Sequence, residues 1–356
     1  SNLGLMYLEG RGVKSDPRKA EELLLAAHEE GARKAKLILG HLYYNGQGRV
    51  ARDYERARRF YGLSADEGFT EANFYLGEIY ARGRGVESDF QQAALYYRAA
   101  ARGGHVVAAF RLGMLFKEGR KVALNYDVAA YWLQAAAWRR HNLAYYHFSE
   151  MLEFGWGVAK NEKAAYEAYR SLLQQNATPL ARLGKARCEL FGKGGAPLRF
   201  SAIAGSLKRL LKSDEASASA YLGLCYFQWA HAKEKINRSY LRRSQEYFDR
   251  SVELNSPVGM TELAKLHLSN GIEKASILKG MKLLTRAADL RYPEAAFLLA
   301  KAHVDGIEGA PEMEACIEYL NLAIDGQIEG AEELLRQLEK ESGADRPIPV
   351  FGGAPA

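Results

Sequence analysis

Residues 72–100 read ANFYLGEIYARGRGVESDFQQAALYYRAA, and this stretch encodes two helices joined by a tight turn. In its first half, Ala72, Leu76, Gly77 and Tyr80 are spaced so that they share one face of an α-helix. The glycine in this stripe allows a partner helix to approach closely, and large side chains of that helix fill the space. One such hairpin cannot bury its apolar faces alone, so the pattern predicts stacked neighbours.

The turn between the two helices has its own signature. Gly83 and Gly85 are suited to the left-handed backbone that ends a helix, and Asp89 follows where a side-chain oxygen can cap the next helix. Other copies of the turn carry the glycine pairs Gly10/Gly12, Gly46/Gly48 and Gly155/Gly157, followed by the capping residues Asp16, Asp53 and Asn161.

The Leu-Gly pair recurs along the chain, at intervals of 36 or 37 residues in its first four copies. The column consists of Leu3-Gly4, Leu39-Gly40, Leu76-Gly77, Leu112-Gly113, Phe148-Ser149, Leu183-Gly184, Leu222-Gly223, Leu263-Ala264, Leu299-Ala300 and Leu335-Arg336. It predicts nine helix pairs and a final half unit, with no separate domain left over.

Three units depart from the pattern. The fourth loop, residues 121–126, lacks the second glycine; the sixth, residues 192–197, is longer and precedes a poorer helix; the seventh carries an insertion at residues 228–237. These departures indicate altered curvature in the middle of the chain, which is either a hinge, a partner site or sequence drift.

Composition favours a folded protein without disulfides. The chain has 356 residues, 48% of them hydrophobic and 26% charged, with a net charge of +6. Its three cysteines, Cys188, Cys225 and Cys316, are widely spaced and indicate small core residues. No apolar run is long enough to span a bilayer, and because the chain opens inside a repeat we expect the native protein to begin earlier.

The whole pattern resembles the Sel1-like repeat, a relative of the tetratricopeptide repeat. The matching residues are Leu76, Gly77, Tyr80, Gly83, Gly85, Val86, Asp89, Ala93, Tyr97, Ala99, Ala100 and Gly103. The resemblance implies an all-α fold, a right-handed α-solenoid superhelix. Residues 1–342 would form a single solenoid of about nine and a half repeats. Residues 343–356, in which Pro347 and Pro349 follow each other closely, would form an extended or disordered tail.

Sel1-like proteins are adaptors, so the resemblance implies a non-enzymatic scaffold for protein partners. With its decayed middle repeats the chain is most similar to alginate-type exopolysaccharide-export lipoproteins. That similarity implies envelope secretion or polysaccharide-export partners, in the bacterial periplasm or at the periplasmic face of the outer membrane. Two alternatives stay open: a regulatory or host-interaction adaptor that binds one protein or peptide, and a carbohydrate-binding module in contact with polysaccharide.

The sequence offers little for catalysis. None of the eight histidines lies in an HExxH motif or at ligand spacing from a cysteine, and His267 and His303 fall in the Tyr80 column as core substitutes. The Gly-x-Gly loops lie between helices, where a phosphate-binding loop does not occur. We therefore expect no catalytic residue, metal or cofactor, and, since acidic residues are interleaved with the basic ones, no nucleic-acid partner.

A binding surface is the better prediction. If the first helix of each pair lines the concave wall, as in the tetratricopeptide fold, the side chains two and three residues before the glycine and one and five after it face the groove. They are Phe74, Tyr75, Glu78, Arg82, Phe110, Arg111, Met114, Tyr146, His147 and Glu150, continued by Tyr221, Leu224, Phe227, Phe297 and Lys301. The alternative is that Phe74, Phe110 and Tyr146 pack between helices.

Overall fold

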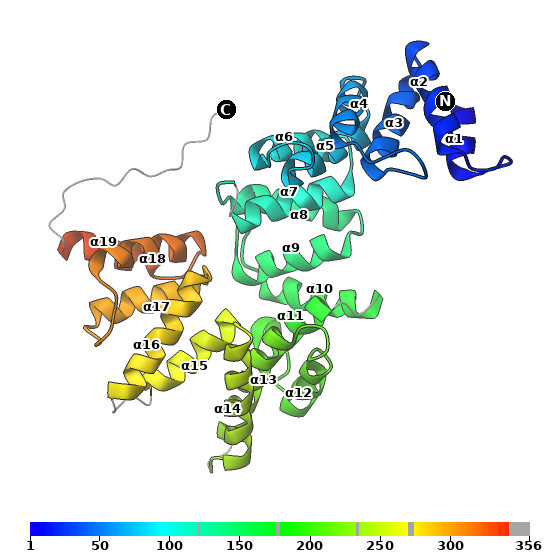
Figure 1. The fold of residues 1–356 in the computed structure, drawn as a ribbon. Helices are drawn as coiled ribbons and strands as arrows, with labels where there is room; N and C mark the ends of the chain where they lie inside the picture. Colours follow the sequence, from blue (N-terminus) through cyan, green and yellow to red (C-terminus); the bar gives the residue numbers. More distant parts are fainter. Residues whose placement is uncertain (120–121, 176–178, 233–234, 270–273, 342–356) are drawn as a thin grey trace. The chain divides into compact units, whose positions relative to one another are not determined.

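The computed structural model describes residues 1–119, 122–175, 179–232, 235–269 and 274–341, so the predicted tail at 343–356 lies outside the described residues (Figure 1). Within these ranges the chain forms nineteen α-helices and one short 3-10 helix, which confirms the all-α class. The helices of the first half are α1 Asn2–Glu9, α2 Pro17–Glu29, α3 Arg33–Asn45, α4 Tyr54–Asp66, α5 Thr70–Arg82, α6 Phe90–Arg102, α7 Val106–Glu118, α8 Tyr126–Trp138 and α9 Asn142–Phe154. Those of the second half are α10 Glu162–Gln175, α11 Pro179–Leu190, η1 Lys193–Gly195, α12 Phe200–Lys208, α13 Glu215–His231, α14 Arg238–Glu253, α15 Pro257–Ser269, α16 Lys274–Asp289, α17 Pro293–Val304, α18 Met313–Asp325 and α19 Ala331–Glu341.

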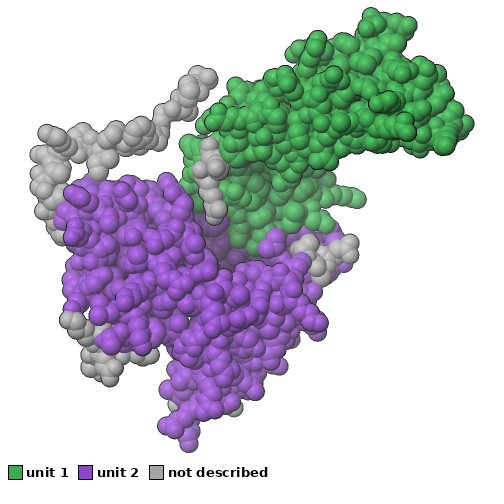
Figure 2. Space-filling model, viewed as in Figure 1, with its two compact units in different colours: residues 1–151, 157–159 green, residues 152–156, 160–356 purple. Residues whose placement is uncertain are grey.

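Within each unit, neighbouring helices pack as pairs, for example α1 with α2, α3 with α4 and α13 with α14, and the second helix of a pair packs on the first helix of the next, as α4 does on α5. The nineteen described α-helices are the number that nine pairs and a final half unit require, as the Leu-Gly column predicts. The chain divides into two compact units, residues 1–151 with 157–159 and residues 152–156 with 160–356 (Figure 2). The single solenoid over 1–342 stays a prediction.

The predicted caps and turns are confirmed. The side chains of Asp16, Asp53, Asp89 and Asn161 each accept a hydrogen bond from a backbone N–H two or three residues further on. Gly83 and Gly85 have positive φ values of 61° and 68°, so the helix ends where the glycine pair predicts.

The glycine column marks the closest approach between paired helices. A Cβ atom added to Gly40 or Gly77 would lie 2.6 Å from ring carbons of Tyr61 or Tyr97 on the partner helix, and Gly223 meets Phe248 in the same way. Each aromatic ring is buried and fills the space above a glycine.

Replacing Gly77 with alanine is therefore expected to lower the free energy of unfolding by about 1–3 kcal/mol, because the added methyl group would overlap the buried ring of Tyr97. Gly62, inside α4, is the matched control: nothing lies within 4 Å of its added Cβ, and alanine there should stabilise the helix by up to about 1 kcal/mol. Chemical denaturation of both variants measures the two effects. Equal shifts in the same direction would contradict the close-approach argument.

The middle of the chain departs from the repeat, as its sequence predicts. α12 has only 9 residues, whereas α13 and α14 have 17 and 16, against 13 in most helices of the first unit. Part of the insertion at 228–237 lengthens α13, and residues 233–234 lie outside the described residues.

The cysteines are buried and free, as small core residues. Burial raises the pKa of Cys188 and Cys225 to about 12, so both thiols stay protonated near neutral pH.

Candidate partner-binding surface

The first helices of the third to fifth pairs, α5, α7 and α9, carry the predicted groove residues of the first unit. Tyr75, Arg111 and His147 occupy equivalent positions on α5, α7 and α9, one per repeat. The side chain of Arg111 is 45% exposed, and Tyr75 and His147 are partly exposed. We call these three residues the exposed row.

A buried carboxylate supports the middle of this row. Glu78, whose side chain is 8% exposed, accepts a hydrogen bond from the hydroxyl of Tyr97 at 2.7 Å. Its two oxygens also pair with Arg82 Nη2 at 2.8 Å and Arg111 Nε at 3.3 Å. Burial and the neighbouring Glu78 raise the pKa of Tyr97, which keeps the hydroxyl as a donor. Glu78 therefore fixes two guanidinium groups at the surface and is itself out of a partner's reach.

A second ionic centre supports the row at α9. Lys117 forms an ion pair with Glu150, and its Nζ lies 3.1 Å from His147 Nδ1. The hydroxyl of Tyr146, a buried residue, donates to Glu150 Oε1 at 3.3 Å. These contacts link α7 to α9 and hold the imidazole of His147 in place.

Aromatic packing fixes the other end of the row. The ring of Tyr75 stacks on Tyr61 with centroids 5.0 Å apart and meets His41 and Tyr44 edge to face at 4.8 and 5.1 Å. Burial raises the pKa of Tyr75 and lowers that of His41, so both side chains are uncharged at neutral pH. The phenol is rigid before any partner arrives.

The structure separates the predicted site residues by exposure. Glu78, Tyr146, Tyr221 and Leu224 are buried in the packing and cannot form a contact surface. The partly exposed residues are Phe74, Tyr75, Phe110, Met114, His147, Glu150, Phe227 and Phe297, and the exposed ones are Arg82, Arg111 and Lys301. Tyr221, Leu224, Phe227, Phe297 and Lys301 belong to the second unit, so the connected row consists of residues of the first unit alone.

Two histidines near this surface have a role that sequence reasoning missed. His105 and His141 are helix caps: the Nδ1 atom of each accepts a backbone N–H, from Ala108 and Ala144, at 3.1 Å. Their rings stack on Phe74 and Phe110 with centroids 4.3 and 4.5 Å apart. Both lie eight residues before the glycine column, a spacing that could have revealed them.

These caps predict a pH dependence. Burial lowers the pKa of His105 and His141 below 6.5, with Glu71 opposing the shift at His105 and the charges of Arg111 and His147 reinforcing it at His141. At these two histidines the unfolded chain therefore binds protons more readily than the folded protein. Their contribution to the free energy of unfolding should be complete above pH 6.5 and should be lost as pH falls below that value.

Replacing both histidines with asparagine, which caps without titrating, should flatten this profile by up to about 1 kcal/mol per cap. Denaturation midpoints at a series of pH values measure it. Parallel profiles for the variant and the wild type would contradict the assignment.

The second unit contains a buried ionic cluster around Glu153. This carboxylate is fully buried and pairs with Arg187 Nη2 at 2.5 Å and Lys193 Nζ at 2.9 Å. It also accepts from the hydroxyl of Tyr169 at 3.0 Å. Burial alone would raise the pKa of Glu153, but the two cations hold it below 4.5. Arg187 stands three residues after the glycine column, where other units carry an aromatic residue such as Tyr80.

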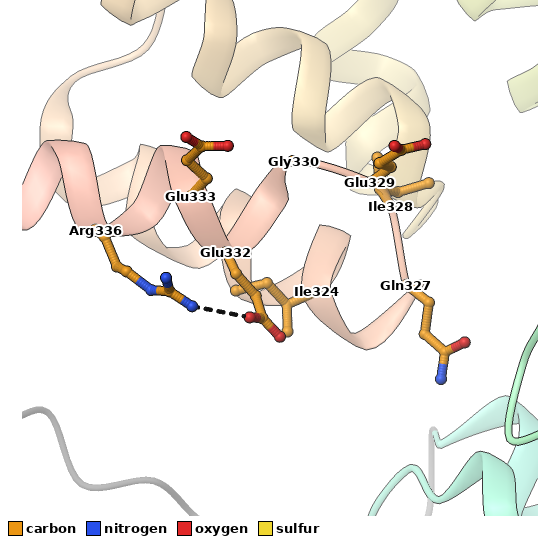
Figure 3. Close-up of a pocket in the computed structure, with 8 residues that line it drawn as sticks. All are labelled: Ile324, Gln327, Ile328, Glu329, Gly330, Glu332, Glu333 and Arg336. Atoms are coloured by element: carbon orange, nitrogen blue, oxygen red, sulfur yellow. Dashed lines mark hydrogen bonds and ion pairs between the residues drawn. The ribbon is translucent and has the colours of Figure 1, made fainter.

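An open hollow lies at the end of the second unit, beside α18 and α19 (Figure 3). It is lined by Ile324, Gln327, Ile328, Glu329, Gly330, Glu332, Glu333 and Arg336. Arg336 pairs with Glu332 at 3.2 Å, which leaves the lining acidic. Among the described residues no cluster of three metal-ligating side chains was found, and no helix described here is long and apolar enough to cross a membrane.

Comparison with known proteins identifies the repeat. A sequence model of the Sel1 repeat matches seven segments that together cover more than half of the chain. They are residues 1–31, 34–69, 70–105, 106–137, 141–170, 257–292 and 293–327, so the irregular residues 171–256 lie between matched segments.

Two curated relatives are similar over short stretches. A component of an ERAD-associated E3 ubiquitin-protein ligase of Arabidopsis thaliana is 33% identical over 88 residues, 24% of this chain and 13% of that protein. A putative Sel1-like repeat-containing protein of Acanthamoeba polyphaga mimivirus is 33% identical over 82 residues, 23% of this chain and 14% of that protein. The chain thus matches only about a seventh of the length of either relative.

Two solved structures share the fold. A protective antigen of uropathogenic Escherichia coli with an SLR fold superposes with a TM-score of 0.56 at 22% identity, over 97% of this chain and 80% of that one. A Sel1 repeat protein from Oxalobacter formigenes gives 0.55 at 27% identity, over 68% of this chain and 96% of that one. Both comparisons agree with the repeat read from the Leu-Gly column.

Proposed function

The chain belongs to the Sel1 repeat family, whose members are typically protein-interaction scaffolds, and from this we propose that its first unit binds a segment of a partner protein along the exposed row. The row consists of Tyr75, Arg111 and His147. No step of chemistry is part of this function: the scaffold acts by holding its partner.

The main support for the proposal is that neighbouring side chains hold each residue of the exposed row in place. Arg111 is held by the buried Glu78, His147 by the Lys117 and Glu150 pair, and Tyr75 by stacked aromatic rings. Tyrosine and arginine dominate binding energy at protein interfaces, and side chains that are already fixed lose little entropy when a partner binds.

The spacing of the row favours an extended partner segment. Equivalent positions on α5, α7 and α9 present one anchor per repeat, so successive side chains of a peptide can each meet one of them. A guanidinium group, an imidazole and a phenol suit a segment that combines acidic or polar side chains with apolar ones.

A pull-down tests the proposal. The intact protein is compared with a groove variant, Tyr75→Ala, Arg111→Ala and His147→Ala, and with a matched variant, Arg59→Ala, Arg98→Ala and Tyr131→Ala, which changes exposed residues of the second helices α4, α6 and α8. Loss of one partner from the groove variant alone supports the proposal. Equal capture by all three proteins would refute it, and capture of polysaccharide in place of protein would support the carbohydrate-binding alternative.

We further propose that the scaffold works in a bacterial cell envelope, in a complex such as one that exports exopolysaccharide. Support comes from the resemblance of its decayed middle repeats to alginate-type export lipoproteins; residues 171–256 are such a region. Fractionation of cells that express the full-length protein tests this. Recovery with the periplasm or outer membrane is expected, and a purely cytosolic protein would favour the regulatory-adaptor alternative.

A further inference from the structure

The irregular region between the matched repeats forms a hollow of its own. It lies in the second unit among α12, α13 and α14, is open to solvent, and has a volume of about 410 Å³. Its lining consists of Lys208, Tyr226, Arg243, Glu246, Tyr247 and Arg250. None of these residues lies in a groove column, so the hollow is separate from the exposed row.

The inner wall of the hollow is aromatic. Tyr226 is only 2% exposed, and its ring stacks on Tyr247 with centroids 5.7 Å apart and an angle of 3° between the planes. Tyr240 and Trp229 extend the packing behind it, at 5.8 and 6.0 Å from Tyr226. This packing gives the hollow a rigid wall.

Two positively charged side chains lie close to the ring of Tyr226. Lys208 Nζ lies 5.7 Å and Arg243 Cζ 5.8 Å from the centroid of the Tyr226 ring, and both side chains are exposed. A hydrogen bond to the hydroxyl of Tyr226 raises the pKa of Lys208, so it stays charged. Within the described part of the chain, neither cation has an ion-pair partner.

The third cation of the lining is already engaged. Arg250 pairs with Glu215 at 2.9 Å and with Glu253 at 3.0 Å. The charge that remains open to a ligand is therefore that of Lys208 and Arg243.

The charge of the surrounding sequence has the same sign. Residues 199–250 contain ten Lys or Arg and five Asp or Glu, so this stretch has a net charge of +5, against +6 for the whole chain. A positive region of this kind attracts acidic partners and increases their rate of association.

We propose that this hollow binds an acidic segment of a partner protein, with side-chain carboxylates held by Lys208 and Arg243 against the tyrosine wall. A planar guanidinium group can bind a carboxylate through two parallel hydrogen bonds. The acidic residues Glu246, Asp249 and Glu253 are interleaved with the cations on α14. They would repel a continuous phosphate backbone, whereas separate carboxylates can bind between them.

Fluorescence anisotropy with a labelled peptide of alternating glutamate and serine tests the proposal. The hollow variant Lys208→Gln with Arg243→Gln is compared with Arg209→Gln and Arg242→Gln, which removes the same charge from neighbouring exposed residues outside the hollow. Binding by the wild type should weaken as salt is raised. The hollow variant should bind roughly fivefold to tenfold more weakly, and the control variant less than about twofold.

Three results would overturn the proposal. Equal losses in the two variants would mean that only net charge matters, and equal binding of a peptide with glutamine in place of glutamate would remove the role of carboxylate. Binding of duplex RNA or of phosphatidylglycerol vesicles, but not of the peptide, would assign the hollow to another kind of anion. The groove variant of the first unit should bind the peptide as the wild type does. A negative result for the hollow therefore does not bear on the proposal that the exposed row binds a partner.

Discussion

Replacing Arg187 with methionine is expected to destabilise the protein by about 3–5 kcal/mol, because it leaves the Glu153 carboxylate buried without its main counter-charge. Lys193 remains at 2.9 Å from Glu153, but its side chain is 19% exposed and forms a single contact with that carboxylate. Chemical denaturation measures the loss.

A second substitution separates lost charge from lost packing. Glu153→Gln in the Arg187→Met background removes the buried charge and keeps an acceptor for the hydroxyl of Tyr169, so it should restore about half of the lost stability. A double variant that is less stable than Arg187→Met alone would contradict the explanation.

The same cluster predicts how stability responds to acid. Because Arg187 and Lys193 hold the pKa of Glu153 below 4.5 in the folded protein, the unfolded chain binds this proton first. The contribution of Glu153 to stability is complete above pH 4.5 and is lost as pH falls below that value toward the folded pKa. Denaturation of the double variant should therefore show a shallower loss in acid than the wild type.

Replacing Gly157 with alanine is expected to cost about 3 kcal/mol or more, through left-handed backbone strain and overlap with the preceding repeat. Gly157 has a φ of +62°, and an added Cβ would lie 2.3 Å from the backbone C and O atoms of Tyr126, the first residue of α8. Backbone atoms cannot rotate out of the way as a side chain can.

Gly10 provides the control for this prediction. Its φ is +70°, but the nearest atom to an added Cβ is 3.5 Å away, so alanine there should cost only about 1–2 kcal/mol of backbone strain. Thermal and chemical denaturation of both variants measure the difference. Equal losses would mean that the second glycine of the loop does not mediate stacking between repeats.

This stacking role explains why the second glycine of the turn recurs. A Cβ atom added to Gly48 would lie 3.0 Å from Cγ of Pro17, and one added to Gly85 would lie 2.9 Å from Cβ of Tyr54, each at the start of the preceding pair's second helix. The sequence predicts these glycines from their helix-ending conformation alone. Their contact with the previous repeat depends on how the pairs stack, which spacing within one repeat cannot show.

The repeat itself could be predicted closely from the sequence, because its determinants are local. Leu76 and Gly77 place the stripe, Gly83 ends the helix and Asp89 starts the next, all within 14 residues. Such signals act through helix geometry and capping, so they can be recognised in the sequence without knowledge of the tertiary structure.

The candidate site could be predicted only in part. Of the residues in the groove columns, Arg111 is exposed and Tyr75 and His147 are partly exposed, but Glu78 and Tyr146 are buried because neighbouring helices cover them. Column position gives the direction of a side chain and not its depth.

The clusters that sequence reasoning missed join side chains of different repeats. Glu153 and Arg187 are 34 residues apart, and Lys208 and Arg243 come from different helix pairs of the irregular region. Neither cluster follows the repeat, so no column of the sequence pattern contains it.

Photo-crosslinking can show whether the first helices of the first unit bind the partner. Benzoylphenylalanine introduced in place of Arg111 on α7, or in place of Arg98 on α6, reports which exposed position lies against a bound protein. We expect a covalent adduct with one partner from position 111 and none from position 98. An adduct from position 98 alone would show that the partner binds the second helices instead of the exposed row.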